Sequence, residues 1–135
     1  MDARAAFAAA RVARLATLGP DGPRLVPVCF AVTGDTIVTA VDAKAKSTRA
    51  LARLRDIERD PRVTLLADHY DDEDWSRLWW ARAEGIAAVR DAPAPPELVD
   101  RYAQYRASPP AGPLIEVSVR RWSGWSARQA GRSSE

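Results

Sequence analysis

Short apolar runs that alternate with polar residues recur along the chain and are separated by turn sequences, a pattern typical of antiparallel β proteins. The clearest run lies near the C-terminus, where Ile115, Val117 and Val119 are apolar and the residues between them are polar. The same criteria predict strands over residues 13–18, 24–32, 36–41, 62–68, 80–90 and 115–120. Six short strands with small helices predict a mainly β fold, a small antiparallel β-barrel with helices at its ends.

Turn residues and irregular positions refine this prediction. The tetrapeptide Gly19-Pro20-Asp21-Gly22 and the tripeptide Thr33-Gly34-Asp35 predict tight connections between consecutive strands. In the strand over 24–32 both alternating sets are apolar, which predicts cover on both faces, by the barrel core and by a helix or a second subunit. Pro27 has no N–H, so that strand must lie at an edge or be interrupted there. Gly85 predicts a bulge in the fifth strand.

Helices are predicted over residues 2–11, 48–59 and 97–106. In the helix over 48–59, Leu51, Leu54 and Ile57 share one face. Its other face carries Arg49, Arg53, Asp56 and Arg59. The acidic run at 71–74 predicts the start of a short helical turn containing Trp75, because carboxylates complement the helix dipole. A calcium site is the alternative, although the run lacks the spaced oxygen ligands and the glycine of such a loop.

Length and composition indicate one globular domain. The chain has 135 residues, of which 47% are hydrophobic and 28% charged. We expect a single domain over residues 1–127 and a polar tail over 128–135. No apolar stretch approaches the roughly 20 residues of a membrane helix, and the first residues are too charged for a signal peptide. These features and the single cysteine, Cys29, predict a cytoplasmic protein without a membrane partner.

The formal net charge of +2 and the pI near 9.0 overstate the basic character of the chain. Only two of the twenty cationic residues are lysines, and the arginines are interleaved with acids along most of the sequence. A sustained basic stripe, which a phosphodiester backbone requires, is missing from the sequence. We therefore expect no nucleic-acid partner.

Side chains alone offer little catalytic chemistry. With one histidine, His69, and one cysteine, one chain cannot assemble a His/Cys metal site, and we predict neither a metal nor a catalytic residue. No serine has the sequence context of a nucleophile elbow, and we interpret His69 as a partly exposed residue at a strand end. If the protein is an enzyme, a bound organic cofactor supplies the difficult step.

The junction after the third predicted strand holds the most specific cluster of cations. Both lysines, Lys44 and Lys46, lie there, followed by Ser47, Thr48 and Arg49 at the start of a helix. A helix start presents unpaired N–H groups and positive dipole charge, and Ser47 or Thr48 can cap it. The junction therefore predicts a site for a phosphate or carboxylate. An ordinary capped helix with solvated cations is the alternative interpretation.

Three stretches of the sequence carry a family resemblance: LVPVCFAV, the segment KAKSTRALARLRDIERDPRVTLLADHYDDEDWSRLWWARAEGIAAV, and the terminal RWSGWSA. They resemble the split-β-barrel oxidoreductases of the pyridoxamine-phosphate-oxidase type, and within them the branch that uses the deazaflavin coenzyme F-420. The resemblance spans about residues 14–127. It implies a six-stranded antiparallel split β-barrel of the FMN-binding-protein type and a homodimer with the cofactor between its subunits.

The resemblance also implies where the cofactor lies. Its phosphate would be held at the junction by Lys46, Ser47 and Thr48, with Lys44 and Arg49. Its ring would lie along the strand backbones Pro27-Val28-Cys29 and Thr39-Ala40-Val41. Trp122 and Trp125 would approach the ring from the other subunit, or else pack in the dimer interface.

The function implied is an oxidoreductase that uses reduced F-420, or a flavin, to transfer hydride to a small organic acceptor. FMN is the alternative cofactor, although the chain lacks a clear counterpart of the basic residue that FMN-dependent relatives carry on the strand before the junction. The glutamate tail of F-420 would extend along Arg53 and neighbouring arginines. Two other classes stay open: a protein that binds a flavin, deazaflavin or haem without turnover, and an OB-like nucleic-acid-binding module.

Overall fold

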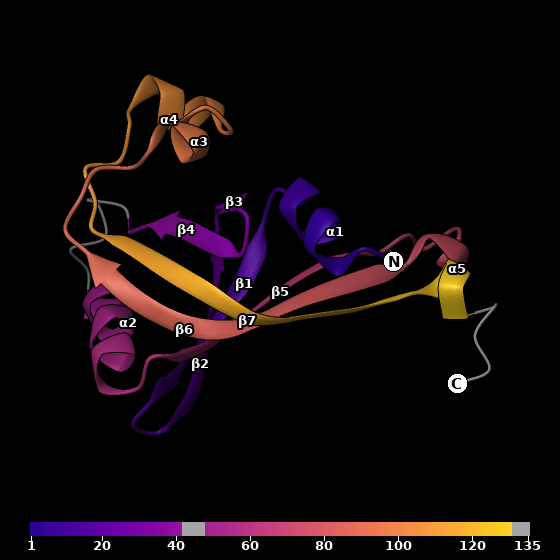
Figure 1. Cartoon of the computed structure of the whole chain (residues 1–135), viewed down its shortest axis with the longest axis horizontal. Helices are drawn as coiled ribbons and strands as arrows, with labels where there is room; N and C mark the ends of the chain where they lie inside the picture. Colours follow the sequence, from indigo (N-terminus) through magenta and orange to yellow (C-terminus); the bar gives the residue numbers. More distant parts are fainter. Residues whose placement is uncertain (42–47, 131–135) are drawn as a thin grey trace.

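The structure, a computed structural model of the whole chain, describes residues 1–41 and 48–130 (Figure 1). One antiparallel sheet forms its centre, with the strand order β2-β1-β5-β6-β7-β4-β3. Its strands are β1 (Ala13–Gly19), β2 (Gly22–Val28), β3 (Ala31–Thr33), β4 (Thr36–Ala40), β5 (Arg62–His69), β6 (Trp79–Arg90) and β7 (Leu114–Ser126). The main core lies inside the curl of this sheet and is built from alternate residues of most strands, with Phe7 of the first helix.

The predicted second strand, 24–32, is two strands, so the described sheet has seven strands and the prediction of six was wrong. Its two parts, β2 and β3, form the opposite edges of the sheet although only Cys29 and Phe30 separate them. The sheet must therefore curl until its edges approach, but β2 and β3 do not pair, so the barrel is not closed as predicted. Pro27 lies on an edge strand, as its missing N–H requires.

Side chains replace strand pairing at this break. The Phe30 N–H donates to the Tyr102 hydroxyl at 3.1 Å, and the Phe30 carbonyl accepts from Arg101 at 2.6 Å. The Cys29 carbonyl accepts from the Thr39 hydroxyl at 2.7 Å. Because buried backbone groups need partners, these contacts make the interruption of the ladder tolerable.

The strand over 24–32 was also predicted to be covered on both faces, and within the single chain it is not. Most residues of β2 are exposed, and Leu25 keeps 74% of its surface in contact with solvent. The reason is the position of β2 at the sheet edge, where it pairs on one side only, with β1.

Helix α1 (Ala3–Ala9) begins at Asp2, whose carboxylate accepts from the Ala5 N–H at 3.0 Å. Its Phe7 is fully buried and contacts the rings of Phe30 and Trp122, at centroid distances of 4.8 and 5.5 Å. The helix packs against β5, β6 and β7, so it covers the inner side of these three strands (Figure 1).

Helix α2 (Thr48–Arg59) has the predicted bounds but not the predicted faces. Ile57 is buried, whereas Leu51 remains 44% exposed and Asp56, which was expected on the solvated face, is only 1% exposed. The helix packs on β1 and β6. Its later turns bring Ile57 and Asp56 into this contact, whereas Leu51 lies in its first turn.

The helix predicted over 97–106 is two short helices, α3 (Pro96–Val99) and α4 (Ala103–Ala107). Tyr102, between the two helices, has an extended backbone. Its hydroxyl and the Arg101 guanidinium bind the backbone of Phe30, and this anchoring interrupts the helix. The predicted turn after the acidic run is confirmed as the 3-10 helix η2 (Trp75–Arg77), capped by the Asp74 carboxylate at 3.0 Å from the Ser76 N–H. Helix α5 (Ala127–Ala130) follows β7.

A bulge where β6 pairs with β7 confirms the prediction at Gly85. Glu84 pairs with Arg121 and Gly85 with Val119, so Arg120 is the extra residue. A Cβ on Gly85 would lie 2.3 Å from the Ser118 carbonyl oxygen, so only glycine fits. The bulge also reverses the alternation along β7, which continues to Ser126, beyond the predicted end.

Candidate functional site

Part of the predicted phosphate junction falls outside the described residues. Lys44, Lys46 and Ser47 lie in the segment that the structure does not describe. Thr48 and Arg49 are the first two residues of α2, and their side chains are likewise not described. The predicted passage from a strand into a helix is confirmed by β4 ending at Ala40 and α2 beginning at Thr48. The role of these five residues in binding an anion stays a prediction.

The two predicted ring-contacting backbones do meet in space. Thr39 is 1% exposed, and its hydroxyl donates to the Cys29 carbonyl at 2.7 Å, which joins the residue after β2 to the penultimate residue of β4. The side chains of Val28 and Val41 are buried in the core, with 7% and 4% exposure. These two segments therefore offer a ligand their backbone groups rather than these side chains.

A cavity of about 430 Å³ lies between α2 and the edge strand β2. It is lined by Thr17, Arg24, Leu25, Val26, Pro27 and Arg53. Pro27 belongs to the predicted ring contact and Arg53 to the predicted path of the glutamate tail. An apolar wall beside two guanidinium groups suits a ligand with a flat apolar part and acidic groups.

A buried carboxylate organises the cationic side of this cavity. Asp56 accepts from the Thr17 hydroxyl at 2.9 Å, and its oxygens lie 2.8 Å from Arg24 Nε and 3.0 Å from an Arg59 terminal nitrogen. Arg24 is thereby fixed through one nitrogen while about half of its side chain stays exposed. The roles of Arg24 and Asp56 were not predicted from the sequence, because Arg24, Thr17 and Asp56 lie on three separate elements and no local pattern links them.

Arg53 differs from Arg24 in its surroundings. Burial lowers the pKa of the Arg53 guanidinium from its ordinary value. Over residues 1–41 and 51–128, whose side chains are described, no carboxylate forms an ion pair with it. A partly buried cation without such a partner favours an anion from outside the chain, since an opposite charge repays the cost of desolvation.

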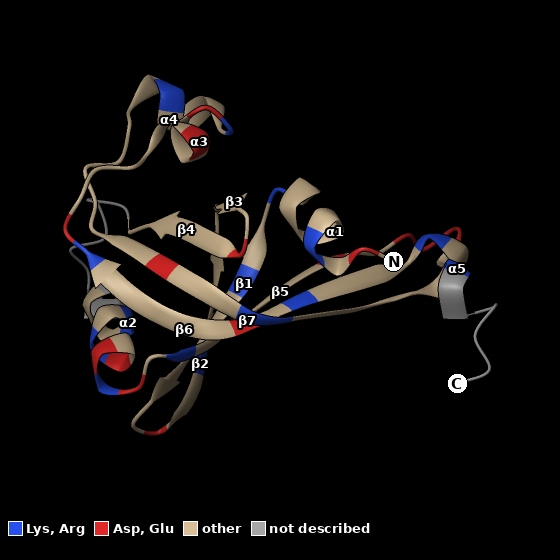
Figure 2. Ribbon diagram, viewed as in Figure 1, with Lys and Arg blue, Asp and Glu red and all other residues tan. Residues whose placement is uncertain are grey.

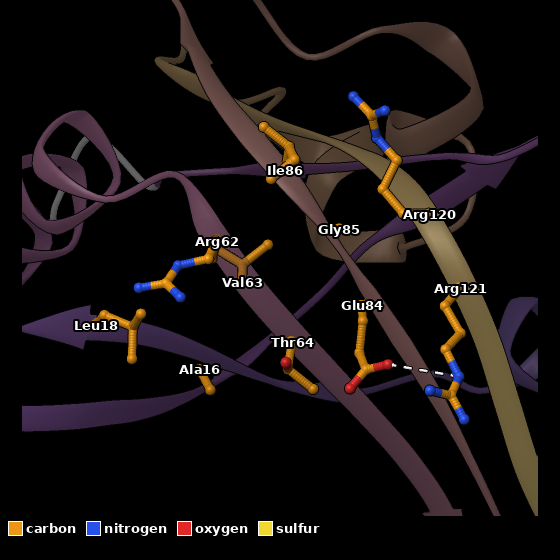
Figure 3. Close-up of a pocket in the computed structure, with 10 residues that line it drawn as sticks. All are labelled: Ala16, Leu18, Arg62, Val63, Thr64, Glu84, Gly85, Ile86, Arg120 and Arg121. Atoms are coloured by element: carbon orange, nitrogen blue, oxygen red, sulfur yellow. Dashed lines mark ion pairs between the residues drawn. The ribbon is translucent and has the colours of Figure 1, made fainter.

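A second hollow of about 470 Å³ lies on the outer face of the sheet around the Gly85 bulge, and Figure 3 shows its residues. Its apolar part is formed by Ala16, Leu18 and Ile86, and its rim carries three arginines. Arg62 is held by Asp60 at 2.6 Å, and Arg121 lies 3.9 Å from Glu84. Acids and arginines are likewise mixed over the rest of the molecule (Figure 2).

A third cavity, which we name the aromatic groove, occupies about 390 Å³ at the far end of β5, β6 and β7. It is lined by Leu66, Asp68, His69, Tyr70, Leu78, Trp79, Trp80, Arg82 and Trp125. Of the two predicted tryptophans only Trp125 lines it. Trp122 faces the inner side of the sheet, packs on Phe7, and donates from Nε1 to Asp35 at 2.9 Å. Hydrogen bonds from Trp122 and Arg4 hold the pKa of Asp35 below its usual value.

Within the described part of the chain, no group of three or more His, Cys, Asp or Glu residues is arranged to hold a metal ion. None of the helices described is long and apolar enough to span a membrane.

Comparison with known proteins identifies the family. The family model described as pyridoxamine 5'-phosphate oxidase matches residues 2–126, nearly the whole chain. The chain belongs to the pyridoxamine 5'-phosphate oxidase family. No curated protein matches the sequence.

Solved structures share the fold of this pyridoxamine 5'-phosphate oxidase family member at low sequence identity. The conserved hypothetical protein Rv2991 from Mycobacterium tuberculosis is 24% identical, with a TM-score of 0.70 over 100% of this chain and 90% of the other. The FAD binding protein from Mycobacterium smegmatis is 17% identical, with a TM-score of 0.58 over 90% and 88%. HupZ from Group A Streptococcus is 22% identical, with a TM-score of 0.59 over 86% and 86%. These likenesses confirm the split-barrel fold, and the F-420 branch stays a prediction.

Proposed function

We propose that this member of the pyridoxamine 5'-phosphate oxidase family is a homodimeric oxidoreductase that binds a flavin-type cofactor beside α2 and reduces a small organic acceptor. Deazaflavin F-420 is the cofactor we favour, with FMN as the alternative. The family membership and a structural neighbour described as an FAD binding protein support a flavin-type ligand. The observation that carries the proposal is the partly buried Arg53 guanidinium at the wall of the α2/β2 cavity.

The residues of this cavity fit such a ligand. Leu25, Val26 and Pro27 form an apolar wall for a planar ring, and Arg24 and Arg53 suit its phosphate or carboxylate groups. The junction residues Lys44, Lys46, Ser47, Thr48 and Arg49 precede Arg53 by four to nine positions, so we place the phosphate at the start of α2. The Thr39–Cys29 hydrogen bond holds together the two backbones that we expect along the ring edge.

A bound flavin or deazaflavin supplies the hydride-transfer chemistry. The protein's own residues bind and orient it: Asp56 fixes Arg24, the arginines neutralise acidic groups, and the buried Thr39 keeps the strand edges in place. Such positioning and charge stabilisation account for catalysis without an acid or base from the cavity wall.

The homodimer is supported by apolar side chains left exposed in the single chain. Leu25 on β2 is 74% exposed, and Ile86 on the outer sheet face is 37% exposed. We propose that a second copy covers this outer face around the Gly85 bulge. A neighbouring subunit would also exclude water from the cofactor, which strengthens the charge interactions at its acidic groups.

The test is a fluorescence titration of the purified protein with F-420 and with FMN. Because a charge-assisted contact is worth about 1.5–3 kcal/mol, Lys46→Ala and Arg53→Gln should each weaken cofactor binding about 10- to 150-fold. Arg55→Gln is the matched control, since Arg55 is exposed on the same helix and does not line the cavity. Unchanged affinity in both Lys46→Ala and Arg53→Gln would place the acidic groups elsewhere.

A cofactor-storing protein is the second candidate, favoured because the described residues that line the α2/β2 cavity include no acid, histidine or cysteine. It predicts tight binding with no oxidation of the reduced cofactor in single-turnover mixing with small acceptors. The oxidoreductase proposal expects cofactor oxidation with at least one acceptor class, at a rate that Arg53→Gln lowers at sub-saturating cofactor concentration.

A further inference from the structure

We propose that the aromatic groove is a binding site for a planar aromatic molecule that carries an anionic group. The groove lies on the outer sheet face at the ends of β5, β6 and β7 that point towards α5, whereas the α2/β2 cavity lies at the opposite end of the sheet (Figure 1). The proposal concerns a separate ligand and does not depend on the cofactor.

The shape and lining of the groove suit a flat ring. Its volume of about 390 Å³ is in the range of small-molecule sites, and Tyr70, Trp80 and Trp125 contribute three aromatic side chains. Trp79 also lines the groove, but its side chain packs against the main core on the other face of the sheet. Trp80 and Trp125 are directly paired in the β6–β7 ladder, so their side chains lie next to each other on one face. Trp125, Leu66 and Tyr70 remain 39%, 37% and 59% exposed, so apolar surface is available for stacking.

Arg82 decides the charge of the ligand. Aromatic faces also attract cations, but here the Arg82 guanidinium already lies over the Trp80 ring, 5.1 Å from its centroid. Its Nε donates to the Ser123 hydroxyl at 3.2 Å, which fixes the orientation of the side chain. Within the described residues neither terminal nitrogen of Arg82 has a hydrogen-bond or ion-pair partner. A held guanidinium with two available nitrogens repels a second cation and can donate two hydrogen bonds to one carboxylate.

The acids around the groove do not cancel this charge. Asp68 is engaged by Arg14 at 3.1 Å, and Glu84 lies 4.0 Å from Arg82 Nε and 3.9 Å from Arg121. A neighbouring hollow shares His69 and Trp79 with the groove and adds Arg77 and Arg128. Asp71 lies 3.5 Å from Arg77, and Asp72 accepts from the Tyr70 hydroxyl at 2.8 Å, so the preference for an anion rests on the terminal nitrogens of Arg82.

Isothermal titration calorimetry of the full chain, without cofactor, tests the proposal with 2-naphthoate and its uncharged analogue 2-naphthamide. We expect naphthoate to bind more tightly than naphthamide. Loss of a stacking ring in Trp125→Ala should weaken both ligands about tenfold. Loss of the guanidinium in Arg82→Gln should weaken naphthoate about tenfold and leave naphthamide within about twofold.

Two matched controls accompany these variants. Trp75→Ala removes an exposed tryptophan outside the groove, and Arg90→Gln removes an arginine from the same strand as Arg82. Both should retain the parent affinities. If Arg82→Gln weakens the two ligands equally, or Trp125→Ala weakens neither, the proposal is wrong.

A second copy of the chain is the competing occupant of the groove. Sedimentation equilibrium of the parent protein and Trp125→Ala separates the two cases. If Trp125→Ala converts a dimer to a monomer and neither ligand binds the parent protein, the groove is a subunit contact and the ligand proposal is overturned. Because the calorimetry uses no cofactor, its result stays interpretable whether or not the α2/β2 cavity binds a flavin-type ligand.

Discussion

Two carboxylates four residues apart, Asp56 and Asp60, each pair with arginine but in opposite surroundings. The Asp56 side chain is 1% exposed and joins three elements, through Thr17 of β1, Arg24 of β2 and Arg59 of its own helix. The Asp60 side chain is 27% exposed and binds Arg62, two residues away, whose side chain is 71% exposed.

The number of contacts does not separate these two carboxylates, because the Asp60 carboxylate also accepts three hydrogen bonds, all from Arg62. What separates them is burial and distance along the chain. A contact between residues two apart forms easily in the unfolded chain and is weakened by solvent, so it adds little to folding. The Asp56 contacts with Thr17 and Arg24 exist only in the folded protein. Without the carboxylate, these partners must form hydrogen bonds with water instead.

The largest effect is therefore expected for Asp56→Ala. It removes two ion pairs and the acceptor of the Thr17 hydroxyl, and should lower the free energy of unfolding by about 2–4 kcal/mol. The value lies below the cost of a fully buried pair because Arg24 and Arg59 are each about half exposed. Urea denaturation at neutral pH measures it, with Asp60→Ala as the control; a loss in the control as large as that in Asp56→Ala would contradict the comparison.

An uncharged contact that is distant in sequence tests which property matters, charge or distance. Tyr102→Phe removes the hydroxyl that accepts from the Phe30 N–H at 3.1 Å and lies 3.0 Å from the Arg11 and Phe30 carbonyl oxygens. We expect a loss of about 1–2 kcal/mol by urea denaturation, since a partly buried backbone group loses a partner. The matched control is Tyr70→Phe, whose hydroxyl donates to Asp72 only two residues away. If distance along the chain governs stability, the control loses much less.

The same distinction explains which parts of the fold could be predicted. The hairpin turns were predictable because their residues are local: Gly22 and Gly34 have φ values of +130° and +60°, which favour glycine. The bounds of α2 and the cap at Asp74 follow from neighbouring residues as well. The break at Cys29 and Phe30 was not predictable, because the side chain that satisfies the Phe30 N–H lies 72 residues later.

The candidate site divides in the same way. The cationic junction at Lys44 and Lys46 is a local cluster and is visible in the sequence. Arg24 lines the cavity because β2 and α2 meet in the fold, through its contact with Asp56. Asp56 was predicted on a solvated helix face because its neighbours on that face are arginines. Its burial depends on Thr17, 39 residues earlier. The outward position of Trp125 and the inward position of Trp122 depend on the extra residue Arg120, whose partner strand lies elsewhere in the sequence.

A smaller loss of stability is expected when one contact of the buried Asp56 carboxylate is removed and its other contacts are kept. Thr17→Val preserves the shape of a side chain that is 2% exposed and deletes its hydrogen bond to Asp56. Because Asp56 keeps both arginines, we expect a loss of about 1 kcal/mol by urea denaturation. In the Asp56→Ala background the same substitution should cost less, since the acceptor is already gone. Additive losses would show that Thr17 and Asp56 are not coupled.

The smallest effect on stability is expected at the exposed Asp60–Arg62 pair, and it depends on pH. Hydrogen bonds from Arg62 lower the pKa of Asp60 from 3.8 to about 2 in the folded protein. Because the folded-state pKa is depressed, the contribution of this carboxylate to stability is complete above about pH 4 and is lost as the pH falls towards 2. The difference in urea midpoint between the parent and Asp60→Asn should therefore be small at pH 5 and vanish near pH 2. A difference that persists unchanged at pH 2 would mean that the carboxylate stabilises the fold through its shape, as the stop of α2, rather than through its charge.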